Sequence, residues 1–359
     1  MKNHFEKDTR NALQAREHAQ WIAYGPSVFQ AARALCETGI LAEVERSAGA
    51  GLTLEEVAGR VALPLYGVRV LMEAGLGIGL LLERGHRYTS TKTAWFLLHD
   101  GMTRAHMDFM HDISYRGMYA LETSVRNGKP EGLKTFGDWP TIYHALAHLP
   151  ERVRKSWFTY DHFYSDEAFP AALPLVFARS PRRLLDIGGN TGQWARACLR
   201  HDAAVEITLF DLPGQLATAR TQFQAVAGAE RVHFSEGNLL DAQQELPDGF
   251  DAVWMSQFLD CFSEPQIVSI LERCQRALAA DGRVYILESF WDRQRHALGA
   301  FCVQQLSLYF TALANGNSQM YRSSTFLACV SAAGFEIEQQ HDGLGAHGAS
   351  TLLVCRRRT

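Results

Sequence analysis

The spacing of hydrophobic residues divides the chain into two stretches of different character. Before about residue 110 the pattern is mostly helical, and from Ser27 the apolar residues fall on one face of a helix that Gly39 can end: Val28, Phe29, Ala32, Leu35 and Cys36. Thr53 and Glu56 have the spacing of a capping box, which predicts that another helix starts there. We therefore expect residues 1–110 to form a helical domain.

A second short helix and a hairpin follow within this first stretch. Val68, Leu71 and Met72 have the spacing of a buried helix face, and residues 80–90 indicate two strands around a turn at Gly85. Two short helices and a hairpin are the elements of a winged helix. Residues 111–178 are mixed in pattern and mostly helical, so we expect them to form a connector.

From residue 181 onward, strands and helices alternate. Seven segments have the composition of strands: residues 182–187, 206–210, 231–234, 250–255, 283–288, 335–341 and 351–355. Because helical stretches separate the first five, these segments predict a parallel, doubly wound sheet of the Rossmann type. Only a short glycine-rich loop separates the last two, so they should pair antiparallel at one edge. We therefore predict an α/β fold over residues 179–359.

Composition and charge narrow the class of protein. Of the 359 residues, 47% are hydrophobic and 21% are charged, and the formal net charge is −4. This balance excludes a disordered or collagen-like chain, and it provides no general basic surplus for nucleic acid or an anionic membrane. The seven cysteines are scattered without a C-x-x-C pair, which argues against a disulfide framework and favours the cytoplasm. No uninterrupted apolar run approaches the roughly 20 residues that span a bilayer.

The turn after the first predicted strand carries the clearest candidate chemistry. Asp186 is followed closely by four residues that suit a tight turn: Gly188, Gly189, Asn190 and Gly192. Their spacing fits neither the G-x-G-x-x-G of a dinucleotide site nor a P-loop. An acid before such a turn suits the amino-acid end of a ligand, since ligands of open α/β sheets lie beyond the carboxyl ends of the strands. Asp211, at the end of the next predicted strand, offers a carboxylate for both hydroxyls of a ribose.

These motifs resemble those of the class I S-adenosylmethionine-dependent methyltransferases, specifically the plant and bacterial small-molecule O-methyltransferases with an amino-terminal dimerisation domain. The family's D-x-G-x-G-x-G corresponds to residues 186–192, with Asn190 for the middle glycine, and its F-D-L-P is intact at residues 210–213. Asparagine tolerates a positive φ better than most residues, so the turn can still form. The resemblance implies S-adenosylmethionine as cofactor, a homodimer formed through residues 1–110, and four further cofactor contacts: Leu212, Asn238, Leu239 and Ser256.

The resemblance also places the catalytic residues, with one departure from the family. Asp260 stands where the family has its general-base histidine, and Glu288 stands where a glutamate brackets that histidine. A second bracketing glutamate is missing near residue 321. Because burial and a nearby like charge both raise the pKa of a carboxyl group, our hypothesis is that the two share a proton and that Asp260 takes the proton of the substrate. Alternatively, Asp260 only caps a helix predicted at residues 262–279, or orients the substrate.

Candidate substrate contacts come from two regions that line the acceptor pocket in the family and from a weaker histidine candidate. They are His162, Phe163, His111, Phe310 and Asn315. Packing in the core explains the aromatic members of this set equally well. His144 and His148 have the i, i+4 spacing of zinc ligands, but no further ligand completes a set, so we expect no metal.

The sequence thus predicts an enzyme that methylates a phenolic or other aromatic small molecule, foremost at oxygen. The changed base position leaves open C-methylation of a phenol ring, and hydroxylation or decarboxylation on the same scaffold. A non-enzymatic alternative is a winged-helix regulator that senses S-adenosylmethionine, but its recognition helix at residues 64–74 would offer only Arg69 as a cation. We therefore expect neither nucleic acid nor a membrane as partner.

Overall fold

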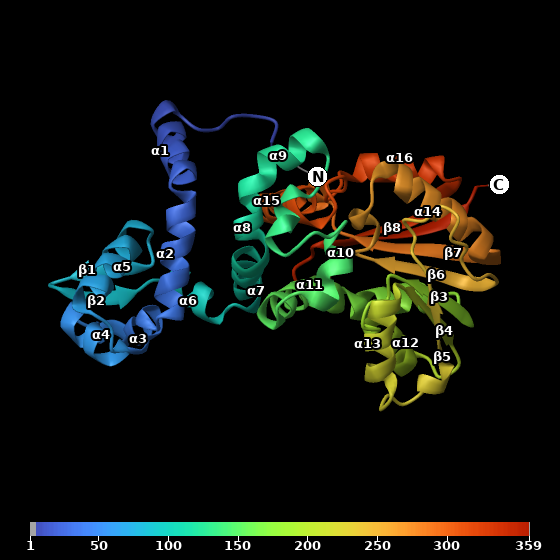
Figure 1. The fold of residues 1–359 in the computed structure, drawn as a ribbon, viewed down its shortest axis with the longest axis horizontal. Coiled ribbons are helices and arrows are strands. Elements are labelled where there is room, and N and C mark those ends of the chain that lie inside the picture. The colour runs from blue at the N-terminus through green and yellow to red at the C-terminus, as the bar shows by residue number, and fades with distance from the viewer. Residues whose placement is uncertain (1–4, 359) are drawn as a thin grey trace. The chain divides into compact units, whose positions relative to one another are not determined.

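The structure, a computed structural model, describes residues 5–358 and divides into two compact units (Figure 1). The first unit ends at Met110 and the second begins at His111. The stretch expected to be a helical connector, residues 111–178, is grouped with the sheet that follows it.

The first unit is helical with one hairpin. Its helices are α1 (Ala12–Ala23), α2 (Gly25–Glu37), α3 (Ile40–Arg46), α4 (Leu54–Val61), α5 (Leu65–Gly77), α6 (Lys92–His99) and α7 (Gly101–Phe109), and its strands are β1 (Leu81–Arg84) and β2 (Arg87–Ser90). The predicted capping box starts α4, because the Thr53 hydroxyl accepts from the Glu56 N–H and the Glu56 carboxylate accepts from the Thr53 N–H. Leu35, Val68 and Met72 are fully buried, as their spacing predicted.

The second unit contains a mixed sheet of seven strands. These are β3 (Arg183–Ile187), β4 (Glu206–Asp211), β5 (Val232–Glu236), β6 (Phe250–Ser256), β7 (Leu278–Glu288), β8 (Phe335–Leu344) and β9 (Ser350–Arg357). Their order across the sheet is β5-β4-β3-β6-β7-β9-β8. The first five strands are parallel, and β9 runs antiparallel to both β7 and β8. The predicted doubly wound sheet with an antiparallel edge is confirmed.

Helices cover both faces of this sheet (Figure 1). The longer ones are α11 (Glu151–Phe177), α12 (Gln193–His201), α13 (Pro213–Phe223), α14 (Glu264–Ala277), α15 (Ala297–Tyr309) and α16 (Ser323–Ala332), and short helices α8 (Tyr115–Gly117), α9 (Leu121–Asn127) and α10 (Ile142–Ala145) precede them. One apolar core lies between the sheet and α14 with α16, and another lies between the sheet and α11, α12 and α13. Burial on both faces explains the continuous apolar runs in the central strands.

Two predicted boundaries shift. The strand expected from residue 283 already begins at Leu278, because Phe250 pairs with Leu278 while Ala252 pairs with Arg283 across an irregularity in the ladder. The helix expected from residue 262 begins at Glu264, because Ser263 and Gln266 form a capping box at its start.

Residues 297–314 are long and apolar enough to cross a membrane by length and composition alone. They form α15 and the π-helical turn Phe310–Ala314 that follows it. Leu313 packs so closely on Gly117 that a Cβ there would lie 2.5 Å from its Cδ2. With Ala300, Val303 and Ala312 also buried, one side of the stretch packs into the second unit, while Leu298 and Phe301 are exposed.

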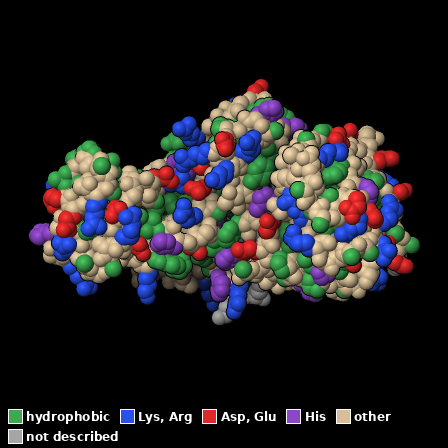
Figure 2. All heavy atoms as spheres, turned by 90° about the horizontal axis from the view of Figure 1, so that it is seen from below, with side chains coloured by type: hydrophobic (Ala, Val, Ile, Leu, Met, Phe, Trp, Pro, Cys, Tyr) green, Lys and Arg blue, Asp and Glu red, His purple; other side chains and the backbone are tan. Residues whose placement is uncertain are grey.

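On the face of the molecule shown in Figure 2, charged side chains are not gathered by sign. On the face shown in Figure 2, Lys and Arg side chains are interspersed with Asp and Glu. This mixture is the normal state of a solvated surface, and it agrees with the small net charge of −4.

Candidate functional site

A cavity of about 310 Å³ lies at the carboxyl ends of the parallel strands. Its lining includes residues from the ends of four neighbouring strands and from the segments that follow them, within 186–194 at β3, 210–215 at β4, 237–240 at β5 and 254–266 at β6, although not every residue of these ranges lines it. Residues of α10 and α11 complete the wall, among them Tyr143, Trp157 and Asp161. This is where ligands bind in open α/β sheets, so the topology and the cavity indicate the same site.

The glycine-rich turn between β3 and α12 adopts the conformation that its sequence predicted. Gly188 has a φ of 70° and Asn190 a φ of 50°, so asparagine occupies the left-handed region that the family's glycine would otherwise supply. A Cβ on Gly188 would lie 2.2 Å from the ring of Phe258. Gly189 and Asn190 line the cavity, while Gly192, with a φ of 80°, precedes the first residue of α12.

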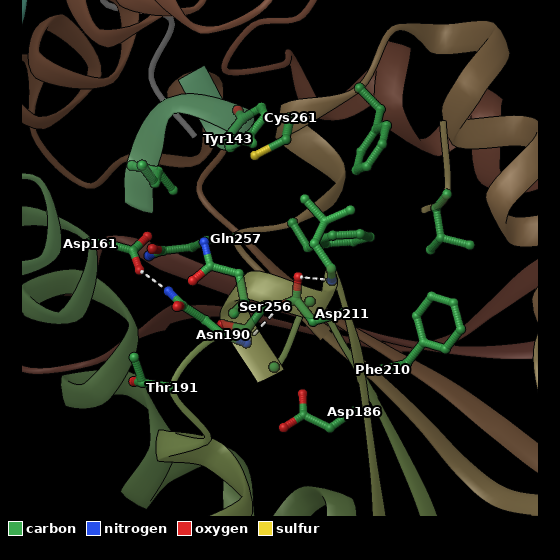
Figure 3. A pocket seen from close by; sticks show the side chains of 18 of the residues that line it. Tyr143, Asp161, Asp186, Asn190, Thr191, Phe210, Asp211, Ser256, Gln257 and Cys261 are labelled. Atoms are coloured by element: carbon green, nitrogen blue, oxygen red, sulfur yellow. Dashed lines mark hydrogen bonds between the residues drawn. The ribbon is translucent and has the colours of Figure 1, made fainter. Parts of the chain in front are cut away.

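Asp211 is held rigidly at the end of β4. Its Oδ2 accepts from the Asn190 N–H at 2.9 Å, and its Oδ1 accepts from the Leu212 N–H at 2.7 Å (Figure 3). Burial raises the pKa of this carboxyl group to about 6, and the charge of Asp161 acts in the same direction. The two backbone donors favour the ionised form, so Asp211 presents a fixed acceptor to the cavity.

Several buried polar atoms on the cavity lining have no hydrogen-bond partner within the described part of the chain. They are Asp186 Oδ2, Asn190 Oδ1, Thr191 Oγ1, Ser256 Oγ and the indole nitrogens of Trp194 and Trp254. Burial, and next the charge of Asp211, raise the pKa of Asp186 well above its ordinary value. Unpartnered buried polar groups are rare in folded proteins, so this cluster indicates a polar ligand.

The segment after β5 forms a wall that a single buried cation supports. Asn238 and Leu239 line the cavity, and the Asn238 side chain accepts from the Leu240 N–H at 3.0 Å. The Arg273 guanidinium, from α14, donates to the carbonyl groups of Leu239, Asp241 and Gln244. This loop therefore keeps its shape without regular secondary structure.

The opposite end of the cavity contains residues that the sequence analysis missed. The Asp161 Oδ2 accepts from the Asn190 side-chain amide at 3.2 Å, and burial raises the pKa of Asp161 to about 6 (Figure 3). Tyr143 and Cys261 lie side by side there, and Gln257 adopts a φ of 47°, which is strained for a residue other than glycine. Asp161 adjoins His162 in a segment already singled out, but no sequence signal marks the other three.

The predicted carboxyl pair is buried beside this wall. Asp260 lies in the 3-10 turn Leu259–Cys261 and is 6% exposed, while Glu288, the last residue of β7, is 1% exposed. Glu288 Oε1 accepts from the N–H groups of Phe258 and Leu259. Burial raises the pKa of Asp260 to about 7, and burial together with the charge of Asp260 holds that of Glu288 well above its ordinary value. Asp260 does not cap α14, because Ser263 does so.

Asp260 itself is not among the residues that line the cavity, whereas its neighbours Phe258, Cys261 and Phe262 are. The Asp260 Oδ1 accepts from the Cys261 thiol at 3.3 Å. The carboxyl group is therefore set within the wall, one side chain away from its open surface.

Two of the five candidate substrate contacts line the cavity. His162 stacks on Phe158, and its Nδ1 lies 3.7 Å from Asp166 Oδ1. Asn315 donates from its side-chain amide to the Cys261 carbonyl at 2.6 Å, so it also fixes the turn that contains Asp260.

The other three candidates lie outside the lining. Phe163 stacks on His347. Consecutive residues of a helix point about 100° apart, so Phe163 and His162 lie on different faces of α11. Phe310 is buried in the core beside Tyr309. His111 is held by Asp112, 2.7 Å away.

Comparison with known proteins identifies the family. The family model of an O-methyltransferase domain matches residues 118–336, and that of a Dimerisation2-like domain matches residues 16–88. The L-tyrosine C(3)-methyltransferase of Streptomyces lavendulae is 23% identical over 326 residues, which cover 90% of this chain and 87% of that protein. The acetylserotonin O-methyltransferase of Homo sapiens is 24% identical, covering 87% of this chain and 90% of that protein. The solved structure of the mitomycin 7-O-methyltransferase MmcR shares the fold, with a TM-score of 0.73 at 20% identity over 96% of this chain and 98% of that one.

The cavity fits S-adenosylmethionine on its own geometry. Asp211, fixed between two amides, suits the hydroxyls of a ribose, and the unpartnered carboxyl oxygen of Asp186 suits a cationic amino group. Asn238 stands on the wall where the adenine would lie. Because the O-methyltransferase model spans more than half of the sequence, the chain belongs to the O-methyltransferase domain family and is an S-adenosylmethionine-dependent methyltransferase.

Proposed function

We propose that this enzyme transfers the methyl group to the hydroxyl oxygen of a phenolic small molecule. The observation that carries the proposal is the Asp260–Glu288 pair beside a cavity wall rich in aromatic side chains. Tyr143, Trp157 and Phe258 supply flat apolar surface for an aromatic ring. The two relatives named above act, by their names, on L-tyrosine and acetylserotonin, which are both aromatic.

The burial of Asp260 makes it a stronger base than an ordinary aspartate. A phenol, with a pKa of about 10, is a poor nucleophile until its proton is removed, and an ordinary aspartate, with a pKa of about 3.9, is too weak a base. Burial raises the pKa of Asp260 to about 7, which brings its basicity closer to that of the phenolate. Burial and the charge of Asp260 also raise the pKa of Glu288, so we propose that the two carboxyl groups share one proton while Asp260 accepts the proton of the substrate.

The remaining residues of the site position the reactants and exclude water. Asp186, Asp211 and Asn238 would hold S-adenosylmethionine, which supplies a methyl group on a sulfonium when it is bound. Glu288 fixes the backbone of Phe258 and Leu259, and Asn315 fixes the carbonyl group of Cys261. These contacts hold the turn around Asp260 rigid, and alignment of this kind supplies much of the acceleration of a displacement reaction.

C-methylation of a phenol ring is the second candidate, because a relative matched over 90% of the chain is named a C(3)-methyltransferase. The same base serves both reactions, since loss of the phenol proton activates the oxygen and the adjacent ring carbon alike. Incubation with a panel of phenols, followed by mass spectrometry and NMR of the products, tests both. A methoxy signal supports O-methylation, a ring methyl signal supports C-methylation, and a gain of oxygen contradicts both.

The variant Asp260→Asn tests the base directly. We expect kcat to fall about 100- to 10,000-fold, the usual contribution of a general base, while calorimetry gives an unchanged Kd for S-adenosylmethionine. Asp281→Asn, which removes an exposed carboxylate from β7, is the control and should keep its activity. Activity of Asp260→Asn within a few-fold of the wild type would contradict the assignment.

We further propose that the protein forms a homodimer through its first unit. Helix α1 has no buried residue, and three of its apolar side chains are largely exposed: Leu13 at 74%, Trp21 at 44% and Ile22 at 67%. An apolar face of this kind favours burial against a second copy, and the match of residues 16–88 to a Dimerisation2-like domain supports it. Light scattering after gel filtration should give twice the chain mass for the wild type and a monomer for Ile22→Glu.

The cytoplasm is the location that we propose. All seven cysteines are free thiols. Thiols persist where the surroundings are reducing, and disulfides form where they are oxidising. Fractionation of expressing cells tests this location.

A further inference from the structure

One layer of side chains separates the proposed base from the cavity. Asp260 is 6% exposed and is not among the described residues that line the cavity, whereas its neighbours Phe258, Cys261 and Phe262 are. A proton that leaves an acceptor in the cavity therefore has to cross this layer to reach the Asp260 carboxylate. The two phenylalanine side chains have no group that can hold a proton, so of the three neighbours only Cys261 offers a path.

The Cys261 thiol connects the two sides of this layer. Its S–H donates to the Asp260 Oδ1 at 3.3 Å. The residue also lines the cavity, and its sulfur lies beside the Tyr143 side chain at that end of the site (Figure 3). A thiol carries one proton, and its sulfur can accept another. The same side chain can therefore receive a proton from the cavity while it gives its own to the carboxylate.

The backbone around the thiol holds it in this position. Cys261 and Asp260 are adjacent in the 3-10 turn Leu259–Cys261. Asn315 donates to the Cys261 carbonyl at 2.6 Å, and Glu288 Oε1 accepts from the Leu259 N–H at 2.9 Å. Both ends of the turn are thus fixed by buried or half-buried side chains. Such alignment matters because a proton is transferred between groups that are already within hydrogen-bond reach.

We propose that Cys261 relays the proton of the acceptor to Asp260. The phenolic O–H bond breaks and its proton joins the Cys261 sulfur, while the S–H bond breaks and the thiol proton joins Asp260 Oδ1. The electron pair left on the phenolic oxygen forms the new bond to the methyl group, and the pair of the broken methyl–sulfonium bond stays on the donor sulfur. The relay rests on the proposed function, because it needs Asp260 as the final base.

The two proton transfers belong to one step. Burial raises the pKa of the Cys261 thiol well above its ordinary value, and the charge of Asp260 acts in the same direction. A free thiolate is therefore disfavoured in this wall, and the sulfur keeps a proton throughout the relay. Cys261 is thereby given a role as a carrier of the proton, whereas a thiolate nucleophile is excluded.

Variants at position 261 test the relay with 4-ethylphenol as acceptor. Cys261→Ala removes both the donor and the acceptor and should lower kcat about 100- to 10,000-fold, as loss of the base itself does. Cys261→Ser keeps a hydroxyl group that can accept and donate, and should be at least about tenfold faster than Cys261→Ala. Combining Cys261→Ala with Asp260→Asn should cost little more than either change alone, because residues that act as a unit are not additive.

Cys302→Ala is the matched control. Cys302 is a half-buried cysteine of α15 and is not among the described residues that line the cavity. This variant loses the same atoms at a place that the relay does not use. It should therefore keep the activity of the wild type with every acceptor.

A more acidic acceptor separates proton transfer from packing. 4-Nitrophenol is ionised near neutral pH, so its oxygen needs no base, whereas 4-ethylphenol keeps its proton. Cys261→Ala should therefore lose less than about threefold in kcat with 4-nitrophenol, despite its large loss with 4-ethylphenol. A side chain that only packed against the acceptor would slow both reactions by the same factor.

Infrared spectroscopy tests the contact without turnover. The S–H stretching band of Cys261 is the one that is lost in Cys261→Ser, and its frequency changes with the hydrogen bonds of the thiol. Addition of 4-ethylphenol to the wild type saturated with S-adenosylhomocysteine should shift this band. An unshifted band would show that the phenol does not touch the thiol, and would overturn the relay.

Each outcome separates the relay from the proposed function. If Cys261→Ala keeps wild-type activity while Asp260→Asn loses it, Asp260 takes the proton directly, so the relay is wrong and the proposed base stands. The relay is also wrong if Cys261→Ser is as slow as Cys261→Ala, or if Cys261→Ala slows both phenols alike. If Asp260→Asn stays active, or if the wild type methylates neither phenol, the proposed function fails and the relay fails with it.

Discussion

Replacing Asp260 by asparagine should remove the part of the pH dependence of stability that arises from this carboxyl group. Its pKa is raised from 3.8 to about 7 by burial, so between these values the folded chain holds a proton that the unfolded chain has lost. The free energy of unfolding therefore falls as the pH rises through this window. At about 1.36 kcal/mol per pKa unit, the wild type should lose about 3 kcal/mol between about pH 5 and about pH 8 through this group, and the variant should lose none of it.

Urea unfolding followed by tryptophan fluorescence measures this effect. The signal reports mainly on the second unit, because it contains five of the seven tryptophans. Asp211, whose pKa burial raises in the same direction, is present in both proteins and cancels in the difference, whereas Glu288 loses the neighbouring charge of Asp260 in the variant, which lowers its pKa there. Asp281→Asn, which removes an exposed carboxylate from β7, is the control and should follow the wild type. If Asp260→Asn and the wild type lose stability in parallel between the two pH values, the Asp260 carboxyl is not desolvated and the argument for its basicity fails.

Three further changes test the donor site and the first unit. Asp211→Asn places an amide N–H2 group against the N–H of Asn190 or Leu212, so one of these backbone donors loses its acceptor. Calorimetry should then show S-adenosylmethionine binding weakened about 10- to 100-fold. An unchanged Kd would show that Asp211 does not bind the donor. Gly188→Ala places a Cβ 2.2 Å from Phe258 at a positive φ and should cost about 1–3 kcal/mol in denaturant unfolding, whereas Gly214→Ala, with nothing within 4 Å, should cost nothing. Thr53→Ala removes one half of the α4 capping box and should lower the free energy of unfolding of the first unit by about 1 kcal/mol. Thr53→Ser keeps the hydroxyl group and should keep the wild-type stability. An equal loss in both variants would show that the hydroxyl is not the cap.

The fold was largely predictable because its pattern is local. Apolar runs between helical stretches predicted the parallel sheet, and a short loop predicted the antiparallel edge. The start of β7 was not predictable, since Asp281 and Gly282 interrupt the apolar pattern and only the pairing of Phe250 with Leu278 extends the strand. The length of α11 was also not predictable from the sequence. Pro170 and Pro174 lie inside this helix, where proline normally ends or kinks it.

The positions of the residues assigned to the donor were predictable for the same reason, whereas those of the residues at the opposite end of the cavity were not. Asp186, Asn190 and Asp211 are set by strand ends and a turn, so their spacing in the sequence fixes their spacing in space. Asp161 reaches the cavity only through the phase of a long helix, and Phe163, two residues later, faces elsewhere. Gln257 gave no signal because its strained backbone is imposed by the packing around β6 and β7, where its N–H donates to the Leu287 carbonyl.

Asn190 is bonded to carboxylates at both ends of the cavity. Its main chain is bonded to the carboxylate assigned to the ribose, and its side chain is bonded to the carboxylate at the far end. Glycine, which the family has at this position, would preserve the first bond and lose the second. Asn190 therefore connects the two ends of the cavity, and whatever effect occupancy of one end has on the affinity of the other must be the same in both directions.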